Sequence, residues 1–306
     1  HRINSAFSEG LSANRVSFPD ENPRVPDHIN NSHESPVMDF LLMAAGLLAF
    51  IVFISFAIGW SASWLGPQIP YAWEPNISLG QDDLSEDDRK IQVYLTKLTE
   101  RLASHSEHVF PVTVHWLPDM EVTNAFATSG GHIHVTRGLL NAVSSENGLA
   151  MVLAHEYAHI ELRHPAVLML EQIGHTILYL ALGLGDSGAG SLAQNTGTLS
   201  FMSFSRDMER AADERAIALL KNEYGHTEGA SELFQGLLKK EDADALPLQT
   251  IQSWWQSHPA TLERIKAIEA HNTELKSEAQ KKDGRFNQES RPLPAWLLDA
   301  LSTPKS

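Results

Sequence analysis

The chain has 306 residues, enough for one large domain or two small ones. Its formal net charge of −15 argues against a nucleic-acid-binding protein, which would carry a basic patch. Because the chain contains no cysteine, it forms no disulfide, and any metal site in it must use histidine and carboxylate ligands.

The first 37 residues form a polar segment of mixed charge. This segment carries four prolines, which are Pro19, Pro23, Pro26 and Pro36. Low hydrophobicity and frequent proline are typical of segments that pack no core, so we expect residues 1–37 to be a mostly disordered tail. The alternative is the end of a domain whose beginning is absent.

A long apolar run follows the tail. No charged residue occurs from Phe40 to Trp73, and residues 40–65 are almost wholly apolar. This exceeds the roughly 20 residues that a helix needs to cross a bilayer. Trp60 and Trp64 at its far end fit the aromatic belt of a membrane interface. We therefore expect one transmembrane helix at residues 38–65.

The charges around this run bear on its nature and its orientation. A signal peptide would have a shorter apolar core with basic residues directly before it, whereas Asp39 precedes this run and the nearest basic residue is Arg24. A buried core helix is the other alternative. Three arginines precede the run, and no Lys or Arg follows it before Arg89. This bias predicts a cytoplasmic N-terminus and a larger C-terminal part outside the cytoplasm.

A linker and a capped helix come next. Residues 66–84 contain three prolines and are predicted to be the linker. Ser85 then begins a helix, because Ser85-x-x-Asp88 resembles a capping box and an apolar stripe at helical spacing follows it. The stripe comprises Ile91, Tyr94, Leu95, Leu98 and Leu102.

Three strand-like runs follow this helix. Turn signals at Pro118-Asp119 and Gly130-Gly131 separate them, so we expect a small sheet with the strand order of a meander. The runs are residues 110–116, 122–127 and 132–136, and a short helix is expected at 138–143.

The next stretch, Ala154-His155-Glu156-Tyr157-Ala158-His159, contains the pattern H-E-x-x-H. Residues four apart lie on one face of a helix, so His155 and His159 can bind one ion. Two neutral imidazoles at this spacing suit zinc, and Glu156 stands beside them to act on a water at that ion. The surrounding residues are apolar at helical spacing, which predicts a buried helix. The pattern also arises by chance, so the interpretation needs a third ligand and a substrate site.

Beyond the motif, helical segments alternate with loops. Residues 165–184 are apolar but include Glu171, Gln172 and His175, so we expect a buried or membrane-grazing helix, not a second span. Residues 183–195 are rich in Gly and Ser and are predicted to be a mobile loop. Further helices are expected at 202–220, 228–239 and 259–271, followed by a C-terminal tail at 273–306.

A second motif supplies the missing ligand. In the stretch Ser205 to Asp213, Glu209 and Asp213 share one helical face, and the small Ala211 and Ala212 would allow close packing on the first helix. Glu209 would bind zinc, and Asp213 would accept the free ring N–H of a ligand histidine. The alternative is a solvated, charged helix face.

Together these motifs resemble those of a known family. H-E-x-x-H followed by E-x-x-x-D in a Ser-Arg-x-x-Glu-x-x-Ala-Asp frame is similar to the membrane-associated zinc endopeptidases of the HtpX and CAAX-prenyl-protease type, a gluzincin family known as metallopeptidase family 48. The stretches 124–127 with 130–131 and 138–140, and Ser257-His258-Pro259 through Arg264-Ile265, are similar to that family's edge strand and C-terminal motif. The resemblance covers about residues 85–272. With one span, the chain looks closer to singly anchored bacterial members than to polytopic ones.

The resemblance implies roles for further residues. Asn124, Ala125 and Phe126 would bind the substrate backbone as an added strand. His258 would donate to the oxyanion of a tetrahedral intermediate, with capping of the following helix as the alternative. Arg264 would hold the site together by pairing with a carboxylate. The other histidines, including His132, His134, His164 and His175, are interpreted as structural or exposed.

The sequence thus predicts an α+β fold: a mainly helical, zincin-like metallopeptidase domain with a small β-sheet, preceded by one transmembrane helix. We expect one Zn²⁺ per chain, and Glu156 as general base in the hydrolysis of peptide bonds of misfolded or envelope proteins. The expected partners are protein or peptide substrates and the membrane, without nucleic acid. The expected location is a bacterial inner membrane, with the catalytic domain on the periplasmic side.

Two other functions stay open. A catalytically weak zinc-binding scaffold or chaperone-like protein could keep this fold, although a scaffold needs the ligands and not the base Glu156. A zinc hydrolase that acts on something other than a peptide is the third possibility.

Overall fold

The computed structural model describes residues 36–76, 78, 83–183, 204–233, 235–236, 258, 264, 266–270, 273 and 289–302. Some predictions lie outside these residues: most of the N-terminal tail, of the loop at 183–195, of the helix at 259–271 and of the C-terminal tail, and the end of the helix at 228–239. The chain divides into two units, His1–Ile54 and Ser55–Ser306.

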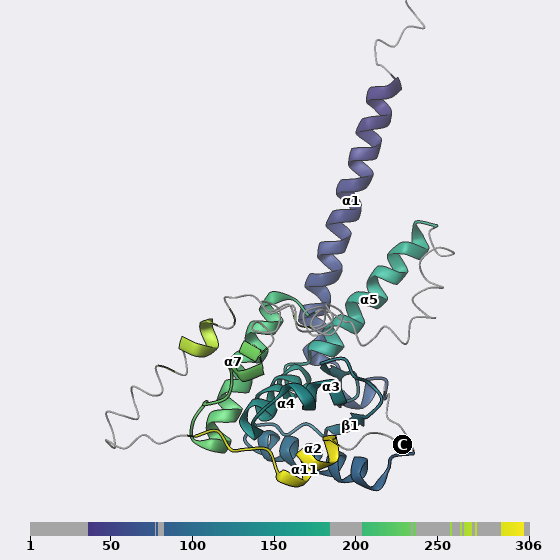
Figure 1. Cartoon of the computed structure of the whole chain (residues 1–306). Helices are drawn as coiled ribbons and strands as arrows, with labels where there is room; N and C mark the ends of the chain where they lie inside the picture. The colour runs from purple at the N-terminus through teal and green to yellow at the C-terminus, as the bar shows by residue number, and fades with distance from the viewer. Residues whose placement is uncertain are drawn as a thin grey trace, which may run out of the picture. The chain divides into compact units, whose positions relative to one another are not determined.

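The longest helix, α1, runs from Pro36 to Leu65 (Figure 1). Among the described residues it is the one helix that is long and apolar enough to cross a membrane, and none of its most apolar window is buried. Large side chains such as Phe50 and Phe53 are exposed along it. A core helix would bury these side chains, so the exposure speaks against that alternative and supports membrane anchoring.

The segment after α1 contains two short 3₁₀ turns, η2 (Gly66–Gln68) and η3 (Tyr71–Trp73), before α2 (Glu86–Ala103) begins. Ser85 caps α2 as predicted, since its Oγ accepts a hydrogen bond from the backbone N–H of Asp88 at 3.1 Å. The same hydroxyl donates to the Asp88 carboxylate at 2.6 Å, whereas the glutamate of a usual capping box accepts from the backbone N–H of the cap residue.

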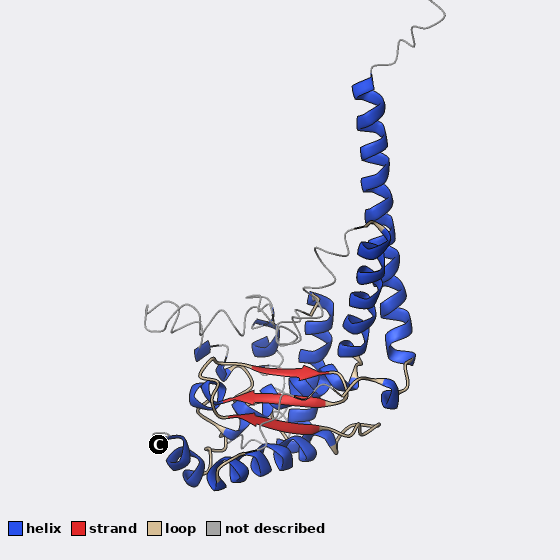
Figure 2. Cartoon of the chain, turned by 90° about the vertical axis from the view of Figure 1, so that its right-hand side faces the viewer, coloured by secondary structure: helices blue, strands red, loops and turns tan. Residues whose placement is uncertain are grey.

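The sheet has three strands, β1 (Thr113–Leu117), β2 (Ala125–Thr128) and β3 (His132–Thr136), in the order β1-β3-β2 (Figure 2). β3 lies parallel to β1 and antiparallel to β2. The predicted small sheet is therefore confirmed, but the predicted meander is wrong, because a meander would pair β1 with β2.

Backbone hydrogen bonds explain the strand order. The chain between β1 and β2 is held against the end of β3 and the residues just after it: Thr136 N donates to Asn124 O at 3.1 Å, and Gly138 N donates to Met120 O at 3.2 Å. The Pro118-Asp119 turn thus does not fold β2 back onto β1. The β2–β3 connection does reverse tightly, through Gly130 and Gly131, whose φ angles of 83° and 76° suit glycine.

Five further helices among the described residues belong to the second unit. They are α3 (Arg137–Ala142), α4 (Glu146–Glu161), α5 (His164–Ala181), α7 (Arg206–Tyr224) and α11 (Ala295–Ser302). The H-E-x-x-H helix α4 lies in the middle and packs on α2, α7 and β2. Every residue from Glu146 to Ile160 is buried, which confirms the predicted buried helix.

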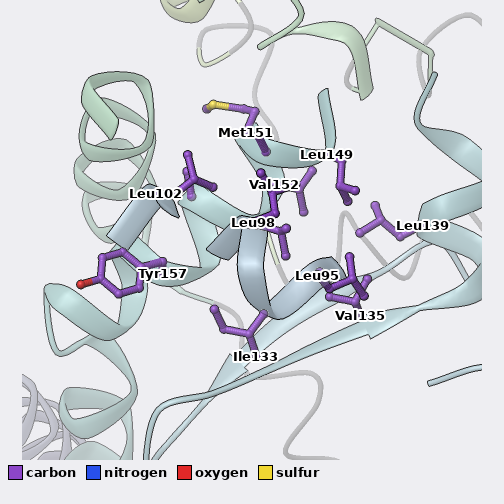
Figure 3. Close-up of a cluster of buried hydrophobic side chains, with 14 of the residues drawn as sticks. Leu95, Leu98, Leu102, Ile133, Val135, Leu139, Leu149, Met151, Val152 and Tyr157 are labelled. Carbon is purple, nitrogen blue, oxygen red and sulfur yellow. The ribbon is translucent and has the colours of Figure 1, made fainter. Parts of the chain in front are cut away.

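A hydrophobic core fixes α4 against the sheet. Side chains of α2, β3 and α4 meet in one buried cluster (Figure 3). Its members include Leu95, Leu98, Leu102, Ile133, Val135, Leu139, Leu149, Met151, Val152 and Tyr157. Because such an interior is close-packed, this cluster holds the motif helix in one position relative to β2 and β3.

Candidate metal centre

Two capped helices carry the candidate ligands. Ser145 caps α4 by accepting from Gly148 N at 3.0 Å, and Ser205 caps α7 by accepting from Met208 N at 3.3 Å. The two helices pack directly against each other. Small residues on both, including the fully buried Ala212, permit this close approach, which brings the end of α4 against the first turns of α7.

Four side chains converge there: His155 and His159 of α4, Glu209 of α7, and His258. Each offers one ligand atom, and these four atoms all lie within 4.8 Å of one another. His155 Nε2 is 3.0 Å from His159 Nε2 and 3.4 Å from the Glu209 carboxylate. The structure thus brings together the three predicted ligands from helices more than 40 residues apart in sequence.

The spacing fits a metal ion. Zinc–nitrogen bonds of 2.0–2.1 Å in a tetrahedron place neighbouring ligand atoms about 3.3 Å apart. The His159 Nε2–Glu209 Oε1 distance is 3.5 Å, and the other neighbouring pairs lie at 3.0–3.4 Å. All four side chains are buried, and imidazole with carboxylate is a donor set that zinc accepts.

Burial and the close approach of these side chains shift their pKa values. Burial opposes ionisation of Glu209, but the nearby His258 and His155 overcome it and lower the pKa of the carboxyl. Burial likewise opposes protonation of His155, yet Asp213 and Glu209 raise its pKa to about 10. Burial and the adjacent His155 hold the pKa of His159 well below its usual range. A metal ion that binds His155 would therefore compete with a proton for this imidazole.

Glu156 points into the same region without belonging to the four-atom group. It is fully buried, and its Oε1 lies 3.3 Å from His258 Nε2. Burial raises the pKa of this carboxyl, while His258 and His155 oppose the rise. The backbone of Ala127 in β2 also opposes it, so the edge of the sheet lies next to Glu156. A carboxyl with a raised pKa beside a metal site is suited to carry a proton.

Behind the ligands lies a carboxylate–arginine pair. Asp213 Oδ1 is 3.0 Å from His155 Nδ1, the ring nitrogen that faces away from the ligand group. Arg264 binds Asp213 with two hydrogen bonds, Nε to Oδ2 at 2.6 Å and Nη2 to Oδ1 at 2.8 Å, and its Nη1 is 2.5 Å from Glu209 Oε2. The structure places both residues beside the site, where the sequence predicted helpers.

One contact was missed by sequence reasoning. His164, interpreted as structural or exposed, is buried, and its Nδ1 lies 2.9 Å from His159 Nδ1. Helical periodicity cannot predict this contact because α4 has already ended. The chain reverses at Arg163, a non-glycine residue with a φ of 66°, which is held by an ion pair to Glu74 and by a hydrogen bond to Ile69 O at 2.6 Å.

His258 belongs to the group of four possible ligands, which the sequence analysis did not predict. Its Nδ1 is 3.3 Å from His155 Nε2 and 3.0 Å from Glu209 Oε1. At this position it offers a fourth ligand atom, in addition to the predicted oxyanion contact. Four protein ligands are typical of closed structural zinc sites, whereas a catalytic site keeps one position for water.

The predicted substrate strand lies at the edge of the described sheet. Ala125 and Phe126 belong to β2, which pairs only with β3 among the described strands. Asn124 directly precedes β2, and its backbone N–H donates to Thr136 Oγ1 at 3.0 Å. All three residues are buried, so exposure alone does not mark them as a binding site.

The chain is similar in sequence to known proteins. Residues 86–272 match the model described as Peptidase family M48. The mitochondrial metalloendopeptidase OMA1 of Schizosaccharomyces pombe is 34% identical over 154 residues, which is 48% of this chain and 42% of that protein. The β-barrel assembly-enhancing protease of Escherichia coli K12 is 31% identical over 146 residues, which is 44% of this chain and 30% of that protein. The E. coli metalloprotease LoiP is 30% identical over 150 residues, 47% of this chain and 57% of LoiP.

These matches cover less than two thirds of the length of each relative. The family model, however, matches more than half of this chain, and the matched residues include both helices of the candidate metal centre. The chain belongs to Peptidase family M48.

Proposed function

We propose that this protein is a membrane-anchored, zinc-dependent endopeptidase in which His155, His159 and Glu209 hold one zinc ion. The observation that carries the proposal is the convergence of these three buried ligands beside the buried carboxyl of Glu156. When bound, zinc would polarise the scissile carbonyl and lower the pKa of water to about 7.

Glu156 would act as the general base. It would take a proton from the attacking water and pass it to the leaving amine. Its burial supports this role, because a raised pKa brings a carboxyl closer to the pH at which it must both accept and donate. Asp213 would keep His155 in the tautomer that presents Nε2 to the ion, and Arg264 would hold Asp213 in place.

Asn124, Ala125 and Phe126 would bind the substrate backbone at the edge of the sheet. The position of β2 beside Glu156 supports this assignment, since a peptide paired with β2 would bring a carbonyl near the base. As substrates we propose misfolded or envelope proteins. The name of the similar β-barrel assembly-enhancing protease supports an envelope role, and the basic residues before α1 support a catalytic unit on the periplasmic side of a bacterial inner membrane.

His258 has two proposed roles that one variant separates. If His258 is an oxyanion donor, its replacement by alanine should leave zinc bound and lower cleavage by about 10²–10³-fold. If His258 is a fourth ligand that closes the site, its replacement should weaken zinc binding and leave cleavage equal or faster, because a position for water opens.

Replacement of Glu156 by glutamine tests the proposal. Glutamine keeps the shape and removes the base, so casein cleavage should fall by at least about 10²–10⁴-fold while zinc content stays unchanged. Glu161→Gln is the matched control, since Glu161 lies on the same helix but pairs with Arg215 outside the metal centre. Equal cleavage by Glu156→Gln and native protein would refute the base assignment. If neither protein cleaves and both protect a client from aggregation, the scaffold alternative holds.

A further inference from the structure

The helix α5 presents two unlike faces. One face packs against the end of α1 and the turn after it: a Cβ added to Gly66 would lie 2.5 Å from Val167 Cγ2, and one added to Gly174 would lie 2.5 Å from Ile58 Cγ2. Gly174 thus permits an approach that a side chain would prevent. Glu171 lies on this same face, 3.6 Å from a Cβ at Gly59.

The opposite face of α5 is apolar and uncovered among the described residues. Ile173, Ile177 and Leu180 recur at i, i+4 and i+7, and they are 49%, 61% and 54% exposed. No charged residue occurs from Ile173 to Gly183. A helix face that meets water normally carries polar side chains, so this face indicates an interaction surface.

The end of α1 identifies what this surface contacts. Phe56, Trp60 and Trp64 are exposed at i, i+4 and i+8 of the one described helix that can span a membrane. The successive contacts of α5 run backward along α1, from Gly66 to Gly59 and Ile58, so the two helices are antiparallel. α5 therefore starts beside the last turns of α1, between Ile58 and Gly66.

We propose that the C-terminal half of α5 lies in the lipid bilayer beside α1. The apolar face of α5 then continues the apolar surface of the span, and this continuity favours lipid over a protein partner, whose surface would need polar groups at its rim. Glu171 lies at the level of Gly59, next to Trp60, and thus at the membrane interface and not in the hydrocarbon.

The length of the apolar part limits how deeply it enters. The helix from Ile173 to Ala181 rises about 13 Å at 1.5 Å per residue, less than half of the roughly 30 Å hydrocarbon core. The apolar part of α5 therefore reaches into one leaflet only. Because α5 begins at His164, which contacts the candidate ligand His159, the lipid contact fixes the metal centre close to the membrane surface.

The absence of cysteine allows a direct test on the full chain. Ile177→Cys carries an environment-sensitive fluorophore in liposomes of phosphatidylethanolamine and phosphatidylglycerol. Phe56→Cys on α1 serves as the lipid-facing control, and Val93→Cys, on an exposed position of α2, serves as the water-facing control. Quenching by lipids brominated in the acyl chain and quenching by aqueous iodide are measured for each. An unchanged thermal transition shows that each variant is folded, and Leu180→Cys provides a second position on the same face.

The Ile177 label should be quenched by brominated lipid as strongly as the Phe56 label and several-fold more than the Val93 label, with the reverse order for iodide. Iodide quenching equal to that at Val93 would overturn the proposal. So would protection from iodide that disappears on dilution of the protein in lipid, or disulfide formation between two Ile177→Cys chains, because a second copy would then cover the face. These outcomes do not depend on zinc or on cleavage.

Discussion

Arg264 should matter for both folding and metal binding, because it neutralises two buried carboxylates at once. It donates two hydrogen bonds to Asp213 and forms an ion pair with Glu209, and all three side chains are buried. Arg264→Ala removes this cation and leaves both carboxylates without it. Arg264→Lys keeps the charge but cannot form the two parallel hydrogen bonds to Asp213.

The expected effects are large. Breaking a buried ion pair by removing one partner costs about 3–5 kcal/mol of unfolding free energy. Loss of the outer contact on a ligand histidine typically lowers metal affinity by about 10–100-fold, and here Asp213 would no longer be held against His155. Arg264→Lys should lose less unfolding free energy and less metal affinity than Arg264→Ala, since a single ammonium still faces Asp213.

Urea unfolding and zinc competition with a chelating dye, measured in detergent on the full chain, give the two quantities. Arg215→Ala is the matched control: Arg215 also makes two hydrogen bonds to one carboxylate, at 2.6 and 2.7 Å to Glu161, but this pair is partly exposed and away from the ligands. Arg215→Ala should lower the free energy of unfolding by about 1 kcal/mol or less and leave zinc affinity unchanged. If Arg264→Ala behaves like Arg215→Ala in both assays, the described network does not support the site.

Three other predictions follow from the same structure. Glu209→Ala should lose most of its zinc by metal analysis, and full retention would remove Glu209 from the site. A reporter that is active only outside the cytoplasm, fused after Ser306, should be active, whereas activity of a cytoplasm-only reporter there would reverse the proposed orientation. Burial lowers the pKa of His115 to about 4 and that of His134 to about 3, so below pH 6.5 the unfolded chain binds more protons and stability falls as pH decreases toward 4. His115→Gln should lose less stability than the native protein between pH 7 and pH 5 in urea unfolding, and an equal loss would contradict this.

Local signals in the sequence predicted most of the helices. Ser85 and the apolar stripe after it located the start of α2, and the H-E-x-x-H pattern located a buried helix. These predictions work because caps and periodicity act within one or two turns. The exposed side chains of α1 also agree with the apolar run that predicted a span.

The strand order could not be predicted from local signals. The sequence shows a turn at Pro118-Asp119, but it does not show that the residues around this turn accept hydrogen bonds from Thr136, at the end of β3, and from Gly138, just after it. Pairing partners depend on contacts between distant residues, which turn residues alone do not specify. The expectation of a meander was wrong for this reason.

In the site too, local spacing predicted some contacts, whereas contacts that depend on chain reversals or distant residues were not predicted. The i, i+4 spacing predicted the pairing of His155 with His159, and the second motif predicted that Glu209 lies nearby. The contact of His164 with His159 depends on a reversal at Arg163 in a conformation that is uncommon for a non-glycine residue. The approach of His258 to His155 joins residues 103 positions apart, and no periodicity reports it.

Zinc-dependent peptide hydrolysis is tested by a zinc titration of the protein after chelator treatment, with casein cleavage as the readout. We expect no cleavage by the zinc-free protein, a linear rise up to one zinc per chain and a plateau beyond it, and cleavage by Glu156→Gln that stays at least about 10²-fold lower at every zinc content. Cleavage that persists in the zinc-free protein, or that reaches the native rate in Glu156→Gln when zinc is added, would contradict this mechanism.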